Sequence, residues 1–159
     1  MLKFTAADIS GHFRRIDRAY TAVMQPLCEQ SGLAQTALDI LLFLANNPGL
    51  DTAKDICTYR NLKPGIVSLY VDKLVGDGYI ERRAVPNDRR KISLVCTAKA
   101  QQIIDCGREY QESFVSRLTD GLSRAEIDEC LRCFEVFDEN LRRISCGDGT
   151  ERMNEDGEG

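Results

Sequence analysis

Residues 71–90 read VDKLVGDGYIERRAVPNDRR, and this stretch decides the fold that the sequence predicts. Its first residues complete a helix, because Gly76-Asp77-Gly78 is a strong stop signal. Two strands are expected next, at Tyr79–Ala84 and Arg90–Cys96, joined by the turn Val85-Pro86-Asn87-Asp88. The stretch therefore predicts a helix followed by a β-hairpin with a basic tip.

Two helices are expected to meet just before this hairpin. Thr52-Ala53-Lys54-Asp55 resembles a capping box with Asp in place of Glu, and it opens a short helix that ends near Arg60-Asn61. Pro64 suits the first turn of the next helix, whose inward stripe is Val67, Val71 and Leu74. A short helix, a tight turn, a second helix and a basic hairpin make a winged helix-turn-helix, whose second helix enters the DNA major groove.

Further helices are expected on both sides of this unit. The apolar spacing predicts a first helix from about Ala6 to Cys28, which Pro26 should kink or nearly end before Gly32 stops it. A second helix begins near Gln35 and stops at Asn46-Asn47-Pro48-Gly49. Two more follow Thr97, the last of them opened by the capping box Ser123-Arg124-Ala125-Glu126. The expected fold class is mainly α with a small β-hairpin wing.

This order of elements predicts four segments. They are an N-terminal dimerisation helix (1–34), a winged helix-turn-helix DNA-binding domain (35–97), C-terminal dimerisation helices (98–146) and a disordered acidic tail (147–159). The last helix carries a stripe close to a heptad seam: Ile127, Leu131, Phe134, Phe137, Leu141 and Ile144. Because the outer helices each show an apolar stripe, we expect them to pack together and against a second subunit, in a homodimer.

Charge is distributed unevenly along the chain. The whole chain has 159 residues and a net charge of −4, whereas the segment from Ala53 to Lys99 holds ten basic and five acidic side chains. Such a basic segment favours a nucleic-acid partner. The longest apolar run, Ala37 to Ala45, is too short to span a membrane, and charged residues occupy the place of a signal peptide. We therefore expect a cytoplasmic protein without a membrane partner.

The candidate contacts to double-stranded DNA lie on the second helix and on the hairpin. On the helix, lysines can reach phosphates, a serine can bond a base edge, and a glycine allows close approach. These residues are Lys63, Pro64, Gly65, Ser68, Leu69 and Lys73. On the hairpin, arginine suits the minor groove, and Asp88 either holds the Arg90 guanidinium or only stabilises the turn. These residues are Arg82, Asp88, Arg89, Arg90 and Lys91.

The run from Val71 to Arg83, followed by Pro86-Asn87-Asp88-Arg89-Arg90, resembles the helix end, strand and D-R-R wing of the multiple-antibiotic-resistance regulator (MarR) family. The resemblance implies a triangular homodimer bound to a near-palindromic operator, usually a repressor released by a ligand or by oxidation. The chain departs from the family at Ala100, where Leu-Thr-x-x-Gly commonly supplies a glycine. Pro64 and Leu69 stand where many members carry Ser, Thr or Arg, which leaves the preferred DNA sequence open.

The resemblance also suggests an effector pocket between the dimerisation helices and the DNA-binding lobes. Candidate contacts to a small-molecule effector are His12, Tyr20 and Tyr59. Cys28 is either a redox switch or an ordinary thiol, since some relatives sense peroxide through a cysteine of the first helix. Cys130 and Cys133 form a C-x-x-C inside a predicted helix, but the chain has one histidine and no second C-x-x-C, so no zinc site is expected.

Enzymatic function is not expected. The chain has no G-x-x-x-x-G-K phosphate loop and no H-E-x-x-H motif, and its single histidine leaves little choice of general base. We expect neither a cofactor nor a metal. Two alternatives to a ligand-responsive regulator remain at this point: a thiol-based redox-sensing regulator, and a winged-helix protein-interaction module without specific DNA binding.

Overall fold

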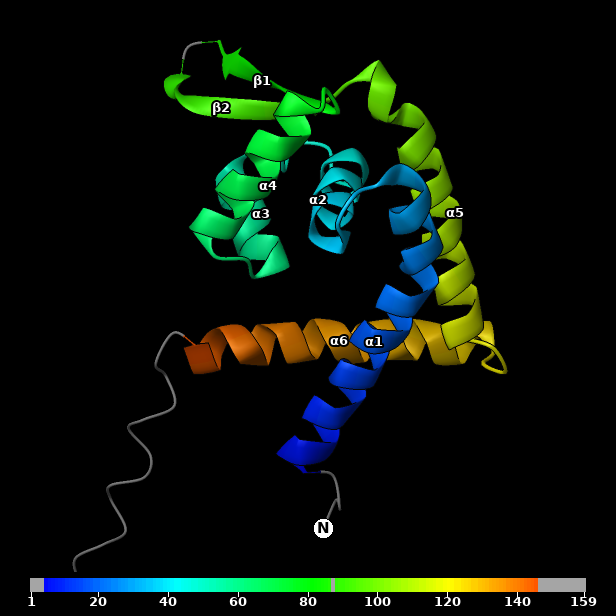
Figure 1. Ribbon diagram of the computed structural model, residues 1–159. Coiled ribbons are helices and arrows are strands. Elements are labelled where there is room, and N and C mark those ends of the chain that lie inside the picture. Colours follow the sequence, from blue (N-terminus) through cyan, green and yellow to red (C-terminus); the bar gives the residue numbers. More distant parts are fainter. Residues whose placement is uncertain (1–4, 87, 146–159) are drawn as a thin grey trace, which may run out of the picture. The chain divides into compact units, whose positions relative to one another are not determined.

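The computed structural model describes residues 5–86 and 88–145, and for Arg89 and Arg90 it describes the backbone alone (Figure 1). The chain divides into one compact unit that ends at Val115 and a second that begins at Ser116. The tail expected at 147–159 lies outside the described residues.

The first helix, α1 (Ala6–Ser31), begins with a capping box in which Asp8 N donates to Thr5 Oγ1 and Thr5 N donates to Asp8 Oδ2. It continues past Pro26 to Ser31, so the predicted end at Cys28 is wrong. Proline removes one backbone hydrogen bond, but Met24 and Leu27 on either side are buried and hold the turn in place. Gly32, with φ of 71°, ends the helix.

The second helix, α2 (Gln35–Asn46), forms the centre of the core. It packs against α1, against α4 (Pro64–Gly76) and against strand β2 (Asp88–Cys96). Because these three elements surround α2, its side chains are buried on most sides of the helix. Its fully or almost fully buried side chains are Ala37, Leu38, Ile40, Leu41 and Leu42.

Helices α3 (Ala53–Arg60) and α4 form the helix-turn-helix. The predicted capping box is present, since Asp55 N donates to Thr52 Oγ1 at 3.2 Å and Thr52 N donates to Asp55 Oδ2 at 2.9 Å. Asn61 adopts a left-handed conformation, φ 50°, and ends α3. The predicted inward stripe of α4 is confirmed, because Val67, Val71 and Leu74 are its buried residues.

The wing consists of β1 (Ile80–Val85) paired antiparallel with β2, from Ile80 opposite Cys96 to Ala84 opposite Ile92. The register shifts between Ala84 and Val85, and β2 begins two residues earlier than predicted. At its other end β2 is held to the loop before α3, where Leu94 N donates to the Asp51 carbonyl oxygen at 2.7 Å. The predicted hairpin is therefore confirmed with small changes in its bounds.

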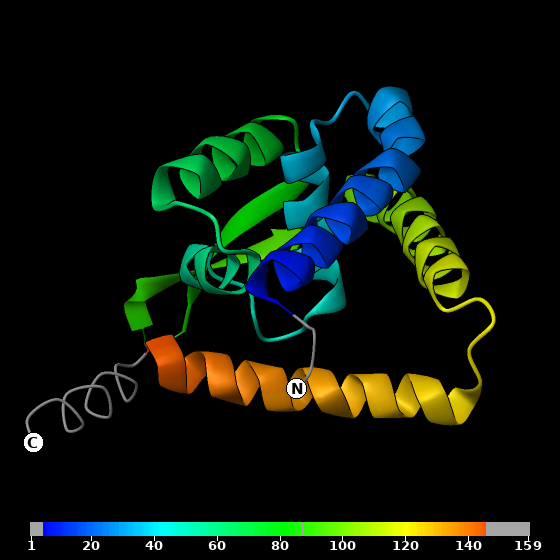
Figure 2. The same ribbon diagram turned by 90° about the horizontal axis from the view of Figure 1, so that it is seen from below.

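A 3₁₀ turn at Ala98–Ala100 leads into α5 (Gln101–Leu118). Ala100 is fully buried, so the position at which the family commonly has glycine accepts a methyl group here. Figures 1 and 2 show α1 and α5 side by side, and the rings of Tyr20 and Phe114 meet edge to face with centroids 5.4 Å apart. Gly107 lies against Leu42 of α2, where a Cβ atom would come within 2.5 Å of Leu42 Cδ2.

The second unit contains α6 (Arg124–Ser145). Its predicted capping box is present, with Ser123 N donating to Glu126 Oε2 at 2.8 Å. None of its residues is buried, and its apolar stripe is exposed from Leu131 to Ile144, with Ile127 half-buried. In the described ranges, no helix is long and apolar enough to cross a membrane.

Candidate nucleic-acid interface and effector cleft

The outward face of α4 lies opposite its buried stripe. Successive helical residues are rotated by about 100°, which places Leu69 on the opposite side from Val67 and Val71. Leu69 is accordingly 61% exposed and Ile66 is 40% exposed. We call this surface the α4 face; it consists of Gly65, Ile66, Leu69, Asp72 and Lys73.

All six predicted helix residues are exposed, and three of them, Gly65, Leu69 and Lys73, lie on this surface. Lys63, Gly65 and Lys73 are exposed, and Lys63 caps α4 without a side-chain hydrogen bond. Pro64 has no N–H group and the Ile66 N–H donates to the Lys63 carbonyl oxygen at 2.9 Å, so Gly65 is the residue of the first turn that can offer its amide to a phosphate. Pro64 and Ser68 are also exposed, but both border a hollow of about 440 Å³ between α3, α4 and the wing. Such a face, basic at both ends and open at the helix N-terminus, suits a phosphate backbone.

The wing differs from a simple cluster of free cations. Arg82 forms an ion pair with Asp72 of α4, and the neighbouring Arg83 pairs with Glu81. Lys91 Nζ lies 3.9 Å from Asp51 Oδ1. Arg82 therefore ties β1 to α4. Asp88 is exposed, while the Arg89 and Arg90 side chains, including the expected pairing of Arg90 with Asp88, lie outside what the structure describes.

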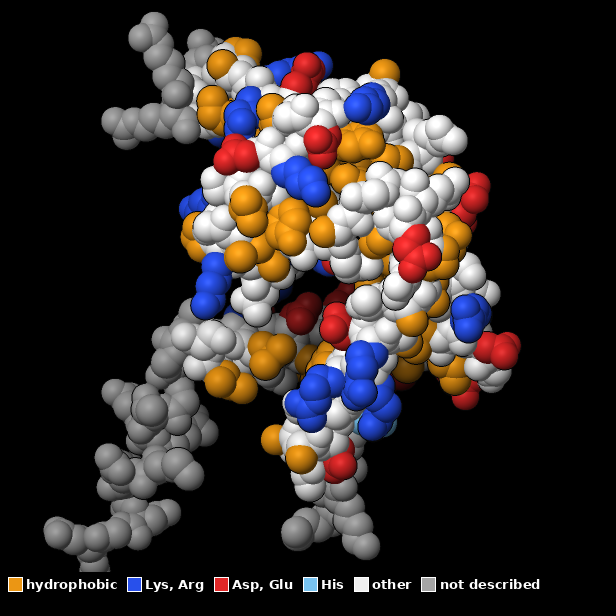
Figure 3. Space-filling view, viewed as in Figure 1, with side chains coloured by type: hydrophobic (Ala, Val, Ile, Leu, Met, Phe, Trp, Pro, Cys, Tyr) orange, Lys and Arg blue, Asp and Glu red, His pale blue; other side chains and the backbone are white. Residues whose placement is uncertain are grey.

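A second basic surface lies on α1. Figure 3 shows basic side chains gathered over the first half of this helix, where Arg14, Arg15 and Arg18 are exposed. Arg15 Nη2 lies 3.0 Å from His12 Nδ1. The sequence interpretation did not single out these arginines, because they are interspersed with apolar residues of the helical stripe.

A cleft of about 520 Å³ opens between α1, the end of α3 and α5. Its walls combine aromatic and aliphatic side chains with one cation, Arg60, and one acidic side chain, Asp17. The lining residues are Phe13, Ile16, Asp17, Tyr20, Arg60, Gln111 and Phe114. Of the predicted effector contacts, Tyr20 lines this cleft, whereas His12 and Tyr59 do not; the Tyr59 ring stacks on Phe43 instead, with centroids 6.1 Å apart.

Arg60 is held at the cleft by a polar network centred on Asp39. Its Nη2 lies 3.2 Å from Asp39 Oδ2, whose side chain is only 16% exposed. Gln35 Nε2 donates to Asp39 Oδ1 at 2.9 Å, and the Tyr20 hydroxyl donates to the same oxygen at 3.3 Å. Gln111 Nε2 in turn donates to the Tyr20 hydroxyl oxygen at 3.0 Å. The network thus joins α1, α2, α3 and α5.

Burial dominates the electrostatics of this network. Desolvation raises the pKa of Asp39 above its ordinary value, although Arg60 and the hydrogen bonds from Gln35 and Tyr20 favour the carboxylate. Desolvation likewise raises the pKa of Tyr20, so this side chain is a neutral hydroxyl that can both donate and accept. The charge of Asp39 is therefore tolerated chiefly because Arg60 is present.

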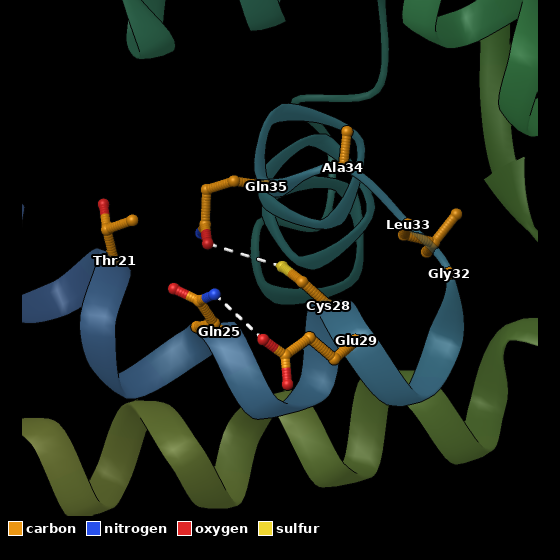
Figure 4. Close-up of a pocket in the computed structure, with 8 residues that line it drawn as sticks. All are labelled: Thr21, Gln25, Cys28, Glu29, Gly32, Leu33, Ala34 and Gln35. Atoms are coloured by element: carbon orange, nitrogen blue, oxygen red, sulfur yellow. Dashed lines mark hydrogen bonds between the residues drawn. The ribbon is translucent and has the colours of Figure 1, made fainter.

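Cys28 lies in an open hollow of about 450 Å³ where α1 meets α2 (Figure 4). Its thiol points toward Gln35, and Sγ donates to Gln35 Oε1 at 3.4 Å. Burial, with the charges of Asp39 and Glu29, raises the pKa of Cys28, and burial also raises that of Cys96. A raised pKa lowers the thiolate fraction, which opposes reaction with peroxide.

The cysteines in the described part of the chain form no disulfide. Among the same residues, no three His, Cys, Asp or Glu side chains are grouped closely enough to hold a metal ion.

Comparisons with known proteins agree with this geometry. The MarR family model matches residues 31–91. The chain is 34% identical over 144 residues to YcgE of Bacillus subtilis (strain 168), an uncharacterized HTH-type transcriptional regulator, covering 83% of this chain and 88% of the relative.

Two solved structures share the fold. The transcriptional regulator PA3341 superposes with a TM-score of 0.77 at 23% identity, over 85% of this chain and 98% of its own. CouR from Rhodococcus jostii RHA1, bound to p-coumaroyl-CoA, superposes with a TM-score of 0.67 at 17% identity, over 86% of this chain and 91% of its own. Together with the α4 face and the wing, the comparisons define a winged-helix transcriptional regulator. The chain belongs to the MarR family, and the predicted family and fold class are confirmed.

Proposed function

We propose that this chain is a ligand-responsive repressor that binds a near-palindromic operator as a homodimer. Helix α4 enters the major groove, and the tip of the β1–β2 hairpin follows the adjacent minor groove. A small-molecule effector releases the DNA.

The observation that carries this proposal is the α4 face. It is exposed along its length, it has a lysine near each end, and the first turn of α4 lacks a side-chain cap. The Arg82–Asp72 ion pair fixes the wing against this helix, so the two contacts would be presented to DNA together. Lys63, Lys73 and Lys91 would contact phosphates, and we assign Arg89 and Arg90 to the hairpin tip from their sequence positions.

The homodimer is supported by the exposed apolar stripe of α6. Leu131, Phe137 and Leu141 are all more than half exposed in the single chain. A row of exposed apolar side chains along one side of a helix is typical of an association site. Because a two-fold interface relates two identical copies, the dimer would present two α4 helices, one for each half of a near-palindromic site.

The effector is supported by the cleft around Arg60. Its volume lies within the range of small-molecule pockets. CouR, which has the same fold, is bound to p-coumaroyl-CoA in its crystal structure. A ligand that displaces Asp39 from Arg60 would act on the residue that ends α3, four positions before α4 begins.

The test is a fluorescence-anisotropy titration of the DNA upstream of the gene for this chain, against scrambled DNA, at two salt concentrations. We expect tighter binding to the upstream DNA, with a steep dependence on salt. Lys73→Ala should weaken binding and reduce the salt slope by about 1. Arg124→Ala removes an equal charge from α6 and should change neither. Equally weak binding to both DNAs would contradict operator recognition.

A further inference from the structure

We infer that α4 recognises its operator mainly through thymine methyl groups, and that Leu69 is the residue that contacts them. This inference rests on the proposed DNA binding and specifies what the α4 face reads.

The first reason is geometric. Leu69 stands at the middle of the α4 face, 61% exposed and directly opposite the buried stripe, with Ile66 exposed beside it. The neighbouring Gly65 has no atoms within 4 Å of an ideal Cβ position, so nothing covers the face at this point. In a helix that lies in the major groove, this side chain would point at base edges rather than at the sugar-phosphate walls.

The second reason is that α4 has few polar groups that could read bases in another way. Helix α4 contains no Asn or Gln, which bond adenine in a bidentate manner, and no Arg; of the side chains that bond guanine in this way it has Lys73, with Lys63 at its N-cap. Asp72, which could accept a hydrogen bond from cytosine, is engaged by Arg82. Ser68 borders the hollow beneath the wing, and Tyr70 packs partly against the core. Lys73 remains, on the last turns of the helix.

The third reason is the chemistry of the major groove. Thymine is the one base that presents an apolar group there, its C5 methyl, and apolar side chains contact it. Leu69 is exposed between Lys63 and Lys73, so it can contact an apolar methyl group on the bases while the two lysines contact the phosphates on either side. An apolar protein partner would not need these flanking cations or the uncapped first turn. Removing one such methyl contact costs about fourfold in affinity, the value for burying one methylene-sized group.

The experiment compares thymine with uracil, which pairs identically but lacks the methyl group. The full chain first selects its preferred duplex from a random-sequence pool. That duplex is then synthesised with uracil in place of thymine, either inside the protected region or only in its flanks. Affinities of the wild type, Leu69→Ala and Lys73→Ala are measured on all three duplexes by anisotropy, and circular dichroism melts check that both variants fold.

We expect the wild type to bind the internally substituted duplex about fourfold more weakly for each contacted methyl, and the flank-substituted duplex unchanged. Leu69→Ala should bind thymine and uracil duplexes equally. Lys73→Ala should bind all of them more weakly while keeping the wild-type ratio, because a phosphate contact does not distinguish the two bases.

Equal wild-type affinity for thymine and uracil duplexes would overturn the inference and leave the proposed DNA binding intact. Retention of the wild-type ratio by Leu69→Ala would overturn the role of Leu69. A pool from which no sequence is enriched would instead refute operator recognition itself, and the inference with it.

Discussion

The two side chains of the Asp39–Arg60 ion pair differ in their exposure to solvent. The Asp39 side chain is 16% exposed and the Arg60 side chain 38% exposed. The carboxylate therefore bears most of the desolvation cost, and its raised pKa shows that the surroundings do not fully offset that cost. An arginine that compensates a nearly buried carboxylate at the wall of a cleft is suited to respond to an anionic ligand.

Arg60→Ala should destabilise the protein by about 1–2 kcal/mol, less than for a fully buried pair because Arg60 is partly exposed. The loss should grow with pH. Without Arg60 the folded-state pKa of Asp39 rises further, so the folded protein binds more protons than the unfolded chain as the pH passes upward from the ordinary aspartate pKa. The contribution of Asp39 to stability is then greatest below that pKa and is lost as the pH rises through the folded pKa.

Urea unfolding of Arg60→Ala between pH 4 and pH 7 measures this slope. Arg60→Ala combined with Asp39→Asn is the matched control, because the amide does not ionise and the added dependence on pH should disappear. A slope that persists in the double variant would show that another group causes it.

The network around Asp39 could not be predicted from the sequence. Its members Tyr20, Gln35, Asp39, Arg60 and Gln111 come from four helices and are common polar residues at unremarkable spacing. Tyr20 alone was a candidate, and only through the family resemblance. Long-range polar pairs depend on how helices pack, and no local pattern encodes that packing.

At the scale of elements, local signals predicted much more. Three helices begin at capping boxes that the structure contains, at Thr5, Thr52 and Ser123, and the last two of these were read from the sequence. The inward stripe of α4 and the hairpin turn were also readable, because helix and strand periods and turn residues act over a few positions. The end of α1 was misplaced because buried neighbours overcame the local effect of Pro26.

Close packing of α5 on α2 depends on Gly107. An alanine there would place Cβ within 2.5 Å of Leu42 Cδ2 and 3.2 Å of Leu42 Cγ, and Leu42 is 1% exposed and cannot move into solvent. We expect Gly107→Ala to destabilise the protein by about 1–3 kcal/mol, the cost typical of overpacking, in spite of the better helix propensity of alanine.

Gly76→Ala is the matched control for this prediction. Gly76 is also helical, but no atom lies within 4 Å of its ideal Cβ position, so alanine should be neutral or stabilise by up to about 1 kcal/mol. Chemical denaturation of both variants gives the comparison. A stabilised Gly107→Ala variant would mean that α5 and α2 separate more easily than the core packing implies.

At the scale of the whole molecule, the single chain leaves α6 incomplete. A helix with a continuous apolar stripe and no buried residue is unfavourable in water as an isolated surface. The stripe runs along one side, whereas the opposite side carries ion pairs such as Arg132–Glu129 and Arg143–Glu139. This division between two sides is what a subunit interface requires and what a solvent-exposed helix would not maintain.

The dimer can be tested by replacing two apolar residues of α6 with Asp, one in the stripe and one outside it, at positions of nearly equal exposure. Phe134 is 47% exposed and Val136 is 46% exposed, yet their rotation of about 200° around the helix places Phe134 within the stripe and Val136 on the other side. Phe134→Asp should produce a monomer in sedimentation velocity and weaken operator binding by about a hundredfold, because two linked half-site contacts become one. Val136→Asp should remain dimeric with unchanged affinity.

Two outcomes would contradict this prediction. If Val136→Asp dissociates the dimer as readily as Phe134→Asp, the interface does not follow the stripe. If neither variant changes the measured mass, α6 does not hold the subunits together.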